Sequence, residues 1–357
     1  MSDQQIPGFR HATNLLRGVS SLAILIWHYQ HFFFIGTQPI DGYDRTSQPL
    51  WHLLQPLYLK GEFAVQIFWC ISGLILAHAY IKQEKTGLAK FSLARFSRLY
   101  PLHLLTLLVV IAIQFVSMKS FGTYQIYWQN DLFHFFTNLF FVQAWGKLGD
   151  GFSFNAPTWS VSVEILVYFI FFALLPLLRR GNIAVSIALL IGLRFLMEKN
   201  PTISEDIFFI QCLLYFLIGV SVYFAVSFSN PIIRVAVLAA FAYVAPHLNP
   251  TFNIGYAYHA FLVVCCAALL DTFPITHQLR RLRIVGELTY SVFLWHAPLQ
   301  MIILMIMMQF NISNSAAQSP LFLLFFLVVT YAVGYASYRW IEQPARKYIN
   351  NRLMPAQ

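Results

Sequence analysis

The feature that most constrains this chain is its series of long apolar segments. A segment of about 20 mostly apolar residues is long enough to cross the roughly 30 Å hydrocarbon core of a bilayer. The sequence therefore predicts an all-α, polytopic membrane protein with about ten transmembrane helices, of which the fifth and seventh are short. The predicted spans are residues 15–35, 63–81, 99–118, 157–178, 182–197, 207–228, 232–247, 252–270, 285–309 and 320–340.

A further apolar stretch, 132–145, contains His134, Asn138 and Gln143. It is too short and too polar to cross a bilayer, so we expect an interfacial or re-entrant helix within the loop 119–156. No stretch between spans is long enough for a separate soluble domain. Residues 1–357 are therefore predicted to form a single transmembrane domain.

Charged residues make up only 10% of the chain, against about 25% in a soluble domain. This composition excludes an ordinary soluble enzyme, a disordered chain and a nucleic-acid-binding protein. The net charge of +9 indicates instead the excess of Lys and Arg in cytoplasmic loops that sets membrane orientation. With the N- and C-termini in the cytoplasm, most Lys and Arg residues fall on that side, and the far side holds Arg45, Lys60, Lys119, Lys147 and Lys199.

Ionisable residues inside predicted spans are candidates for function, because each costs roughly 2.5–3.5 kcal/mol to insert at mid-helix. Four stand out: Arg17, His28, Glu164 and His296. His28 follows Arg17 by 11 residues, about 16 Å along a helix. Counting from the predicted span ends places His28 and Glu164 at one depth, so we expect them to pair, with His28 as a general base. His296 fits either a functional group or a satisfied core histidine.

Arg95 and Arg98 are three residues apart and so share a helical face. With Arg17 they would suit phosphate, because guanidinium groups form paired hydrogen bonds with it. The simpler interpretation is charge that only sets topology. The sequence has no H-E-x-x-H, Walker or G-x-G-x-x-G motif, so we expect no metal site and no bound cofactor.

With these residues in view, the chain resembles the acyltransferase family 3 membrane proteins. The resemblance runs nearly the whole length. It rests on RGVSSLAILIWH, GEFAVQIFWCISGLIL, RFSRLYP, TWSVSVEILVYF, ELTYSVFLWHAPL and RWIEQPARKY, in this order. Many relatives read S-V-E-E-Q-F-Y, whereas Ile165 and Leu166 follow Glu164 here. Many also have a fused periplasmic esterase-like domain, and we expect this protein to be a short form without it.

The resemblance implies a multi-pass enzyme of the bacterial inner membrane. Such an enzyme transfers acetyl from cytoplasmic acetyl-CoA to a sugar hydroxyl on the far side. The acceptor would be a glycan or lipid-linked glycan, with lipopolysaccharide O-antigen as our preferred expectation. The implied catalytic residues are His28, Glu164 and Arg17, with Arg95 and Arg98 binding CoA phosphates and Ser160, Ser291 and His296 in supporting roles.

Other functions remain open at this point. A secondary transporter or flippase for a glycan or organic anion would use the same buried groups as a proton relay. A scaffold for glycan assembly would leave those groups unexplained. The sequence also leaves open whether the acyl group moves directly or through an acyl-histidine, whether it is acetyl or longer, and whether the protein forms homo-oligomers.

Overall fold

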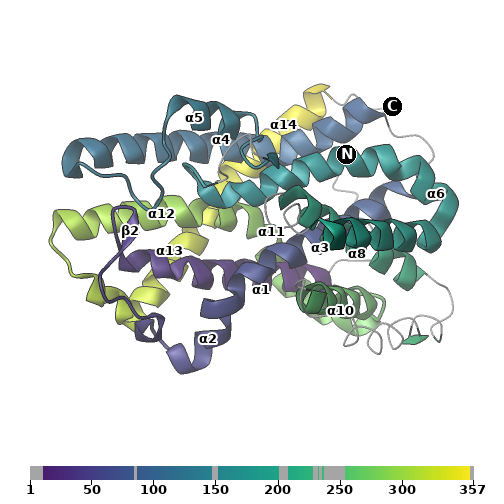
Figure 1. Cartoon of the computed structure of the whole chain (residues 1–357), viewed down its shortest axis with the longest axis horizontal. Coiled ribbons are helices and arrows are strands. Elements are labelled where there is room, and N and C mark those ends of the chain that lie inside the picture. Colours follow the sequence, from purple (N-terminus) through teal and green to yellow (C-terminus); the bar gives the residue numbers. More distant parts are fainter. Residues whose placement is uncertain are drawn as a thin grey trace.

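The computed structural model describes residues 11–83, 87–146, 152–200, 208–227, 232, 235–236 and 254–353. This part of the chain is almost entirely helical (Figure 1). Six of its helical stretches are long and apolar enough to cross a membrane, so the protein is a multi-pass membrane protein. These stretches are Trp51–Tyr80, Leu88–Phe121, Ala156–Gly181, Phe208–Ser227, Thr289–Gln309 and Pro320–Leu353.

The described helices fall into two sets along the chain. In the N-terminal half they are α1 (Ala12–His28), α2 (Trp51–Lys60), α3 (Ala64–Tyr80), α4 (Leu88–Phe121), α5 (Leu132–Leu139) and α6 (Trp159–Lys199). In the C-terminal half they are α8 (Phe208–Ser227), α10 (Ile254–Leu270), α11 (Arg283–Glu287), α12 (Thr289–Gln309), α13 (Pro320–Ser337) and α14 (Gln343–Leu353). A π-helical turn, Tyr338–Glu342, joins α13 to α14. One two-residue hairpin is present, with β1 (Phe34–Ile35) antiparallel to β2 (Gln38–Pro39).

Local sequence explains several helix ends. The Asp131 carboxylate accepts a hydrogen bond from the backbone N–H of His134 and caps α5, as an aspartate before a first turn commonly does. α13 begins with the Ser319 cap followed by Pro320, which has no N–H to leave unpaired at a first helical position. α4 ends at Gly122, whose φ of 69° suits glycine.

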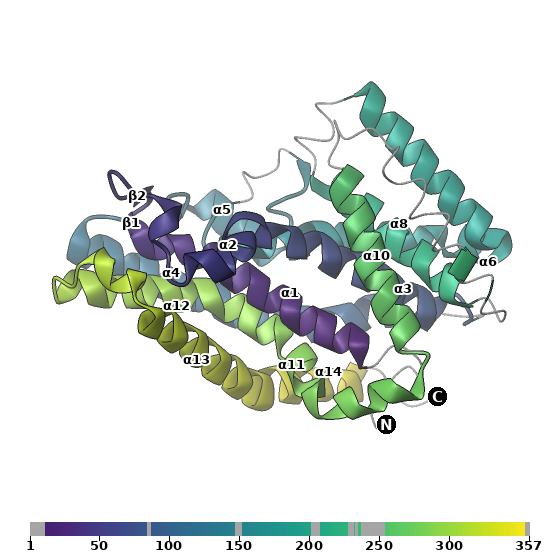
Figure 2. The same ribbon diagram turned by 90° about the horizontal axis from the view of Figure 1, so that it is seen from below.

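The helices agree with most of the predicted spans, with one difference. The predicted fourth and fifth spans form one 41-residue helix, α6, whose second half bends away from the bundle (Figure 2). Pro176 and Gly181 lie near the middle of α6, and such residues permit a sharp bend without ending the helix. The stretch 132–145 contains a helix of only eight residues. The predicted span 232–247 lies almost wholly outside the described residues.

Helices α1, α4 and α12 run parallel along the long axis (Figures 1 and 2). At the first turn of α12, Thr289 accepts a hydrogen bond from Arg17 of α1, and Tyr290 donates one to the carbonyl of Leu99 in α4. At the other end of α1, His28 lies beside His296 of α12. In the predicted topology the first, third and ninth spans cross the membrane in the same direction, and the parallel course of α1, α4 and α12 agrees with this. The parallel packing brings candidate site residues from the three helices together.

Helices α3 and α8 are also parallel and pack closely through glycine. A Cβ atom added at Gly73 would collide with the backbone oxygen of Phe216, and one added at Gly219 would collide with that of Cys70. Small residues let two helices in a membrane approach backbone to backbone. This contact fixes α3 against the bundle, and α3 forms one wall of the cavity described next.

Candidate active site

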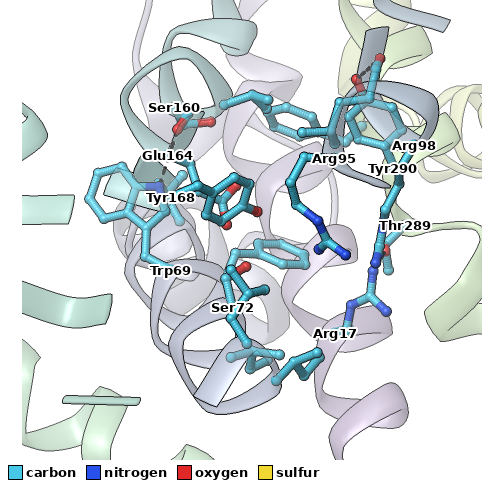
Figure 3. A pocket seen from close by; sticks show the side chains of 18 of the residues that line it. Arg17, Trp69, Ser72, Arg95, Arg98, Ser160, Glu164, Tyr168, Thr289 and Tyr290 are labelled. Atoms are coloured by element: carbon cyan, nitrogen blue, oxygen red, sulfur yellow. Dashed lines mark hydrogen bonds between the residues drawn. The ribbon is translucent and has the colours of Figure 1, made fainter. Parts of the chain in front are cut away.

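A cavity lies where α1, α3, α4, α6 and α12 meet. Figure 3 shows its lining, with Arg17, Arg95 and Arg98 on one side and Glu164, Tyr168 and Ser72 facing them. The complete lining comprises Arg17, Ile24, Val65, Phe68, Trp69, Ile71, Ser72, Ile75, Leu76, Arg95, Arg98, Leu99, Ser160, Val161, Glu164, Tyr168, Thr289, Tyr290 and Phe293. The cavity is thus apolar over most of its surface and strongly basic at one side.

The three arginines predicted to bind phosphate converge on this cavity. Arg17 donates one hydrogen bond of 3.0 Å from Nη2 to the Thr289 hydroxyl. The guanidinium of Arg95 lies 6.0 Å from the centre of the Tyr168 ring, within the range of a cation–π contact. Within the described part of the chain, no ion pair shorter than 4.0 Å joins Arg17, Arg95 or Arg98 to a carboxylate. Their remaining N–H donors are therefore available to an anionic ligand.

Glu164 lies in this cavity, called the arginine cavity below. The sequence had predicted instead that Glu164 would lie beside His28. Its carboxylate accepts hydrogen bonds from the side chains of Ser72 and Tyr168 and lies within the electrostatic reach of Arg95 and Arg98. One of its oxygens, Oε1, is buried without a partner. The predicted His28–Glu164 pair is therefore wrong.

Glu164 differs from its predicted position because the segment that precedes α6 is buried. Asn155 and Thr158 are fully buried, and the side-chain amide of Asn155 donates a hydrogen bond to the carbonyl of Leu294 in α12. The helix that carries Glu164 thus begins inside the bundle, whereas the sequence count had placed its start at the membrane surface. Glu164 consequently lies among the arginines.

His28 belongs to a separate cluster of histidines. Its ring centre is 4.8 Å from that of His296 and 5.1 Å from that of His31. The Nδ1 of His296 contacts the backbone carbonyl of Phe293 at 2.5 Å. A carbonyl only accepts hydrogen bonds, so Nδ1 bears the proton. In the neutral ring the other nitrogen, Nε2, is then unprotonated, and it has no hydrogen-bond partner among the described residues.

Gln300 organises this histidine cluster. Its side-chain amide donates a 2.8 Å hydrogen bond to the backbone carbonyl of His28, and its side-chain oxygen lies 3.4 Å from Nδ1 of His31. The amide thereby ties the C-terminal end of α1 to α12. Gln300 follows His296 by one helical turn on the same face, a signal that the sequence analysis did not use.

The two serines expected in supporting roles have different surroundings. Ser160 lines the cavity, but its hydroxyl donates a 3.1 Å hydrogen bond to the backbone carbonyl of Pro157. Ser291 lies outside the cavity lining, and its hydroxyl donates a 2.6 Å hydrogen bond to the carboxylate of Glu342. Both contacts hold neighbouring segments together.

Three consecutive residues at the start of α12 fasten three other segments around the cavity. Thr289 accepts a hydrogen bond from Arg17 of α1, Tyr290 donates one to α4, and Ser291 donates one to Glu342 of the π-helical turn. Glu342 is buried and within the electrostatic reach of Arg17 and Arg98. Sequence reasoning missed Glu342 as a site residue, although it is an acid within the quoted RWIEQPARKY motif and π-helical turns are frequent at functional sites.

No group of three or more His, Cys, Asp or Glu residues in the described ranges is arranged to hold a metal ion. The arrangement offers a basic cavity suited to an anion and a pair of imidazoles one helical turn beyond it. These groups suit the binding of a phosphorylated molecule and proton transfer or nucleophilic attack at an adjacent position.

Comparison with known proteins gives the family. Two curated relatives match parts of the chain: "Acyltransferase MdmB" of Streptomyces mycarofaciens is 28% identical over 159 residues, and "Protein 2 in picA locus" of Rhizobium radiobacter is 34% identical over 110 residues. These matches span 44% and 30% of this chain, and 36% and 46% of the relatives' own lengths. No solved structure matches the chain. A family model described as an acyltransferase domain matches residues 10–339, and the chain belongs to this acyltransferase family.

Proposed function

We propose that this protein is a membrane O-acetyltransferase of the bacterial inner membrane. It moves acetyl from cytoplasmic acetyl-CoA to a hydroxyl of a surface polysaccharide sugar, with lipopolysaccharide O-antigen as the acceptor. The family supports acyl transfer as the reaction class. The observation that carries the proposal is the convergence of Arg17, Arg95 and Arg98 on one cavity beside the His28–His296 pair.

The arginine cavity is the donor site in this proposal. CoA is a polyanion, and charge-assisted hydrogen bonds from guanidinium to phosphate are roughly twice as strong as neutral ones. Among the described residues, no carboxylate lies within 4.0 Å of the three arginines to compete with phosphate. The apolar part of the lining then accommodates the pantetheine arm as it extends towards His28, about 16 Å along α1 from Arg17.

The imidazole pair is the chemical site. In a direct route, His28 removes the proton of the acceptor hydroxyl, the resulting oxygen nucleophile attacks the thioester carbonyl, and the C–S bond breaks. The CoA thiolate then takes the proton from His28. In a covalent route, a ring nitrogen of His28 attacks first, CoA leaves, and the acceptor hydroxyl then displaces the imidazole. His296, with its proton on Nδ1, orients His28 or relays its proton.

Glu164 has a donor-side role in this account. It lies opposite the arginines and accepts hydrogen bonds from Ser72 and Tyr168. A carboxylate in this place limits the net positive charge of the empty cavity and orients the guanidinium groups until phosphate binds. We therefore propose that Glu164 positions the donor, whereas proton transfer from the acceptor belongs to the histidines.

The test uses purified protein in detergent, without any transmembrane gradient. We expect the wild type to release CoA from acetyl-CoA in the presence of O-antigen, with acetyl appearing on the glycan by mass spectrometry. The His28→Ala variant, folded by size-exclusion chromatography, is the control and should transfer none. If the wild type neither hydrolyses nor transfers acetyl in detergent, but moves a glycan or organic anion across vesicles under a proton gradient, the transporter alternative is correct and this proposal is wrong.

A further inference from the structure

Two apolar side chains of the cavity lining, Ile24 and Phe293, mark its boundary on the side of the histidines. Ile24 and Phe293 line the cavity, whereas neither His28 nor His296 does. Ile24 precedes His28 by four residues on α1, and Phe293 precedes His296 by three on α12. Because residues three or four apart lie on one helical face, both imidazoles lie one turn beyond this end of the cavity.

Phe293 contacts both sides of this boundary. Its ring forms part of the cavity wall, and its ring centre lies 5.6 Å from that of His296. It is 9% exposed, so its ring is closely surrounded. Its backbone carbonyl also accepts the hydrogen bond from His296 Nδ1. A side-chain substitution at this position therefore changes the space at the boundary while leaving the carbonyl that fixes the His296 tautomer.

We propose that Phe293, together with Ile24, sets the length of the acyl group that the enzyme accepts. This inference rests on the proposed function, because it concerns an acyl chain that travels from the cavity to His28. A thioester carbonyl that reaches His28 must have its acyl chain at or beyond this apolar boundary. A short chain fits beside the Phe293 ring, and each added methylene meets the ring or Ile24.

The physical basis is packing in a closed apolar space. One methylene in a hydrophobic pocket discriminates substrates by about 10–200-fold. Here a long acyl chain is rejected because it clashes with the Phe293 side chain. Removing the Phe293 ring creates room for the longer acyl chain. The short acyl group then loses its close fit.

The experiment measures kcat/KM for CoA release with acetyl-, propionyl-, butyryl- and hexanoyl-CoA in detergent, at a fixed glycan concentration. We expect the wild type to prefer acetyl over butyryl by at least about tenfold. Phe293→Ala should raise the ratio of butyryl to acetyl by about tenfold or more. Phe293→Leu, which preserves more of the packing, should shift the ratio in the same direction by less and serves if the alanine variant does not fold.

The matched control is Phe68→Ala, which also removes a phenyl ring from the cavity lining. Among the described residues, the Phe68 ring makes no contact with the rings of His28 or His296. Its loss should therefore leave the butyryl-to-acetyl ratio of kcat/KM within about threefold of the wild type. The inference is overturned if the wild type accepts butyryl as well as acetyl, or if folded Phe293 variants keep the wild-type ratio. A wild type that turns over none of these thioesters overturns the proposed function itself, which is a distinguishable result.

Discussion

At the scale of single residues, the start of α12 fixes the shape of the site. Thr289, Tyr290 and Ser291 each bond to a different segment, and two of these bonds involve charged groups, Arg17 and Glu342. Hydrogen bonds between helices inside a membrane are worth about 1–2 kcal/mol in model systems. We therefore propose that this part of α12 holds the cavity together without taking part in chemistry.

The Ser291→Ala variant tests that assignment. Ser291 donates to the buried carboxylate of Glu342, so its removal leaves a buried acceptor without this partner. We expect a loss of about 1–2 kcal/mol in stability, seen as a lower melting temperature in detergent, while kcat for acetyl transfer stays within about threefold. A complete loss of transfer at unchanged melting temperature would instead make Ser291 a catalytic group.

At the scale of helices, α1 is held at its N-terminal end by a carboxylate from elsewhere in the chain. Asp271, just beyond α10, accepts hydrogen bonds from the backbone N–H groups of His11, Ala12 and Thr13 and from the Thr13 hydroxyl, at 2.7–3.1 Å. First-turn N–H groups have no partner within their own helix, and a negative charge there is favoured by the helix dipole. Asp271 thus fixes the helix that carries both Arg17 and His28.

We expect Asp271→Ala to lower the stability by about 0.5–2 kcal/mol, the usual cost of removing a helix cap. Asp271→Asn keeps an acceptor oxygen and should lose less. Thermal unfolding of the purified protein in detergent measures both. Equal melting temperatures for the wild type and Asp271→Ala would show that this cap does not hold α1.

The contact of α3 with α8 gives a second prediction at this scale. Because a Cβ atom at Gly219 would meet the backbone of Cys70, Gly219→Ala must move α3 and α8 apart. Such overpacking costs about 1–3 kcal/mol, and it displaces the α3 residues that line the cavity, including Ser72. We expect a lower melting temperature and weaker CoA binding. The matched control is Gly192→Ala, where no neighbouring atom lies within 4 Å of the added carbon; an equal loss there would contradict the packing account.

Sequence reasoning at this scale succeeded where composition decides the outcome. Apolar length identified α3, α8 and α13 to within three residues at each end, because a membrane requires such lengths. It also identified α4 and α12, although α4 begins eleven residues before its predicted start and α12 begins four residues after its predicted start. The spacing of Arg95 and Arg98 placed them together on α4, and both line the cavity with Arg17. Helix length and the spacing of residues along one helix depend only on that helix's own residues, so the sequence alone predicts them.

Sequence reasoning failed where one segment depends on another. Glu164 was assigned to His28 because its helix was assumed to start at the membrane surface, whereas the buried Asn155 segment starts it deeper. The join between the two halves of α6 was predicted as a break, although backbone hydrogen bonds continue through the bend. Glu342 and Gln300 gain their significance only from contacts with distant helices.

At the scale of the whole molecule, the proposed site has two parts that lie one after the other along the bundle. Arg17, Arg95 and Arg98 lie in the cavity near the first turns of α12, and the His28–His296 pair lies beyond the Ile24–Phe293 boundary. We propose that the arginine cavity binds the donor and that the histidines perform the transfer. Two substitutions, one in each place, should therefore have separable effects.

The most direct measurement is CoA affinity in detergent for Arg98→Ala and His28→Ala, determined beside acetyl transfer by the same preparations. Arg98→Ala removes charge-assisted bonds of roughly 1.5–3 kcal/mol, so CoA should bind about tenfold to a hundredfold more weakly. His28→Ala should abolish transfer while CoA affinity stays within about threefold of the wild type, because His28 lies about 16 Å along α1 from Arg17. If folded His28→Ala loses CoA binding as severely as Arg98→Ala, the division into a donor cavity and a separate chemical site is contradicted.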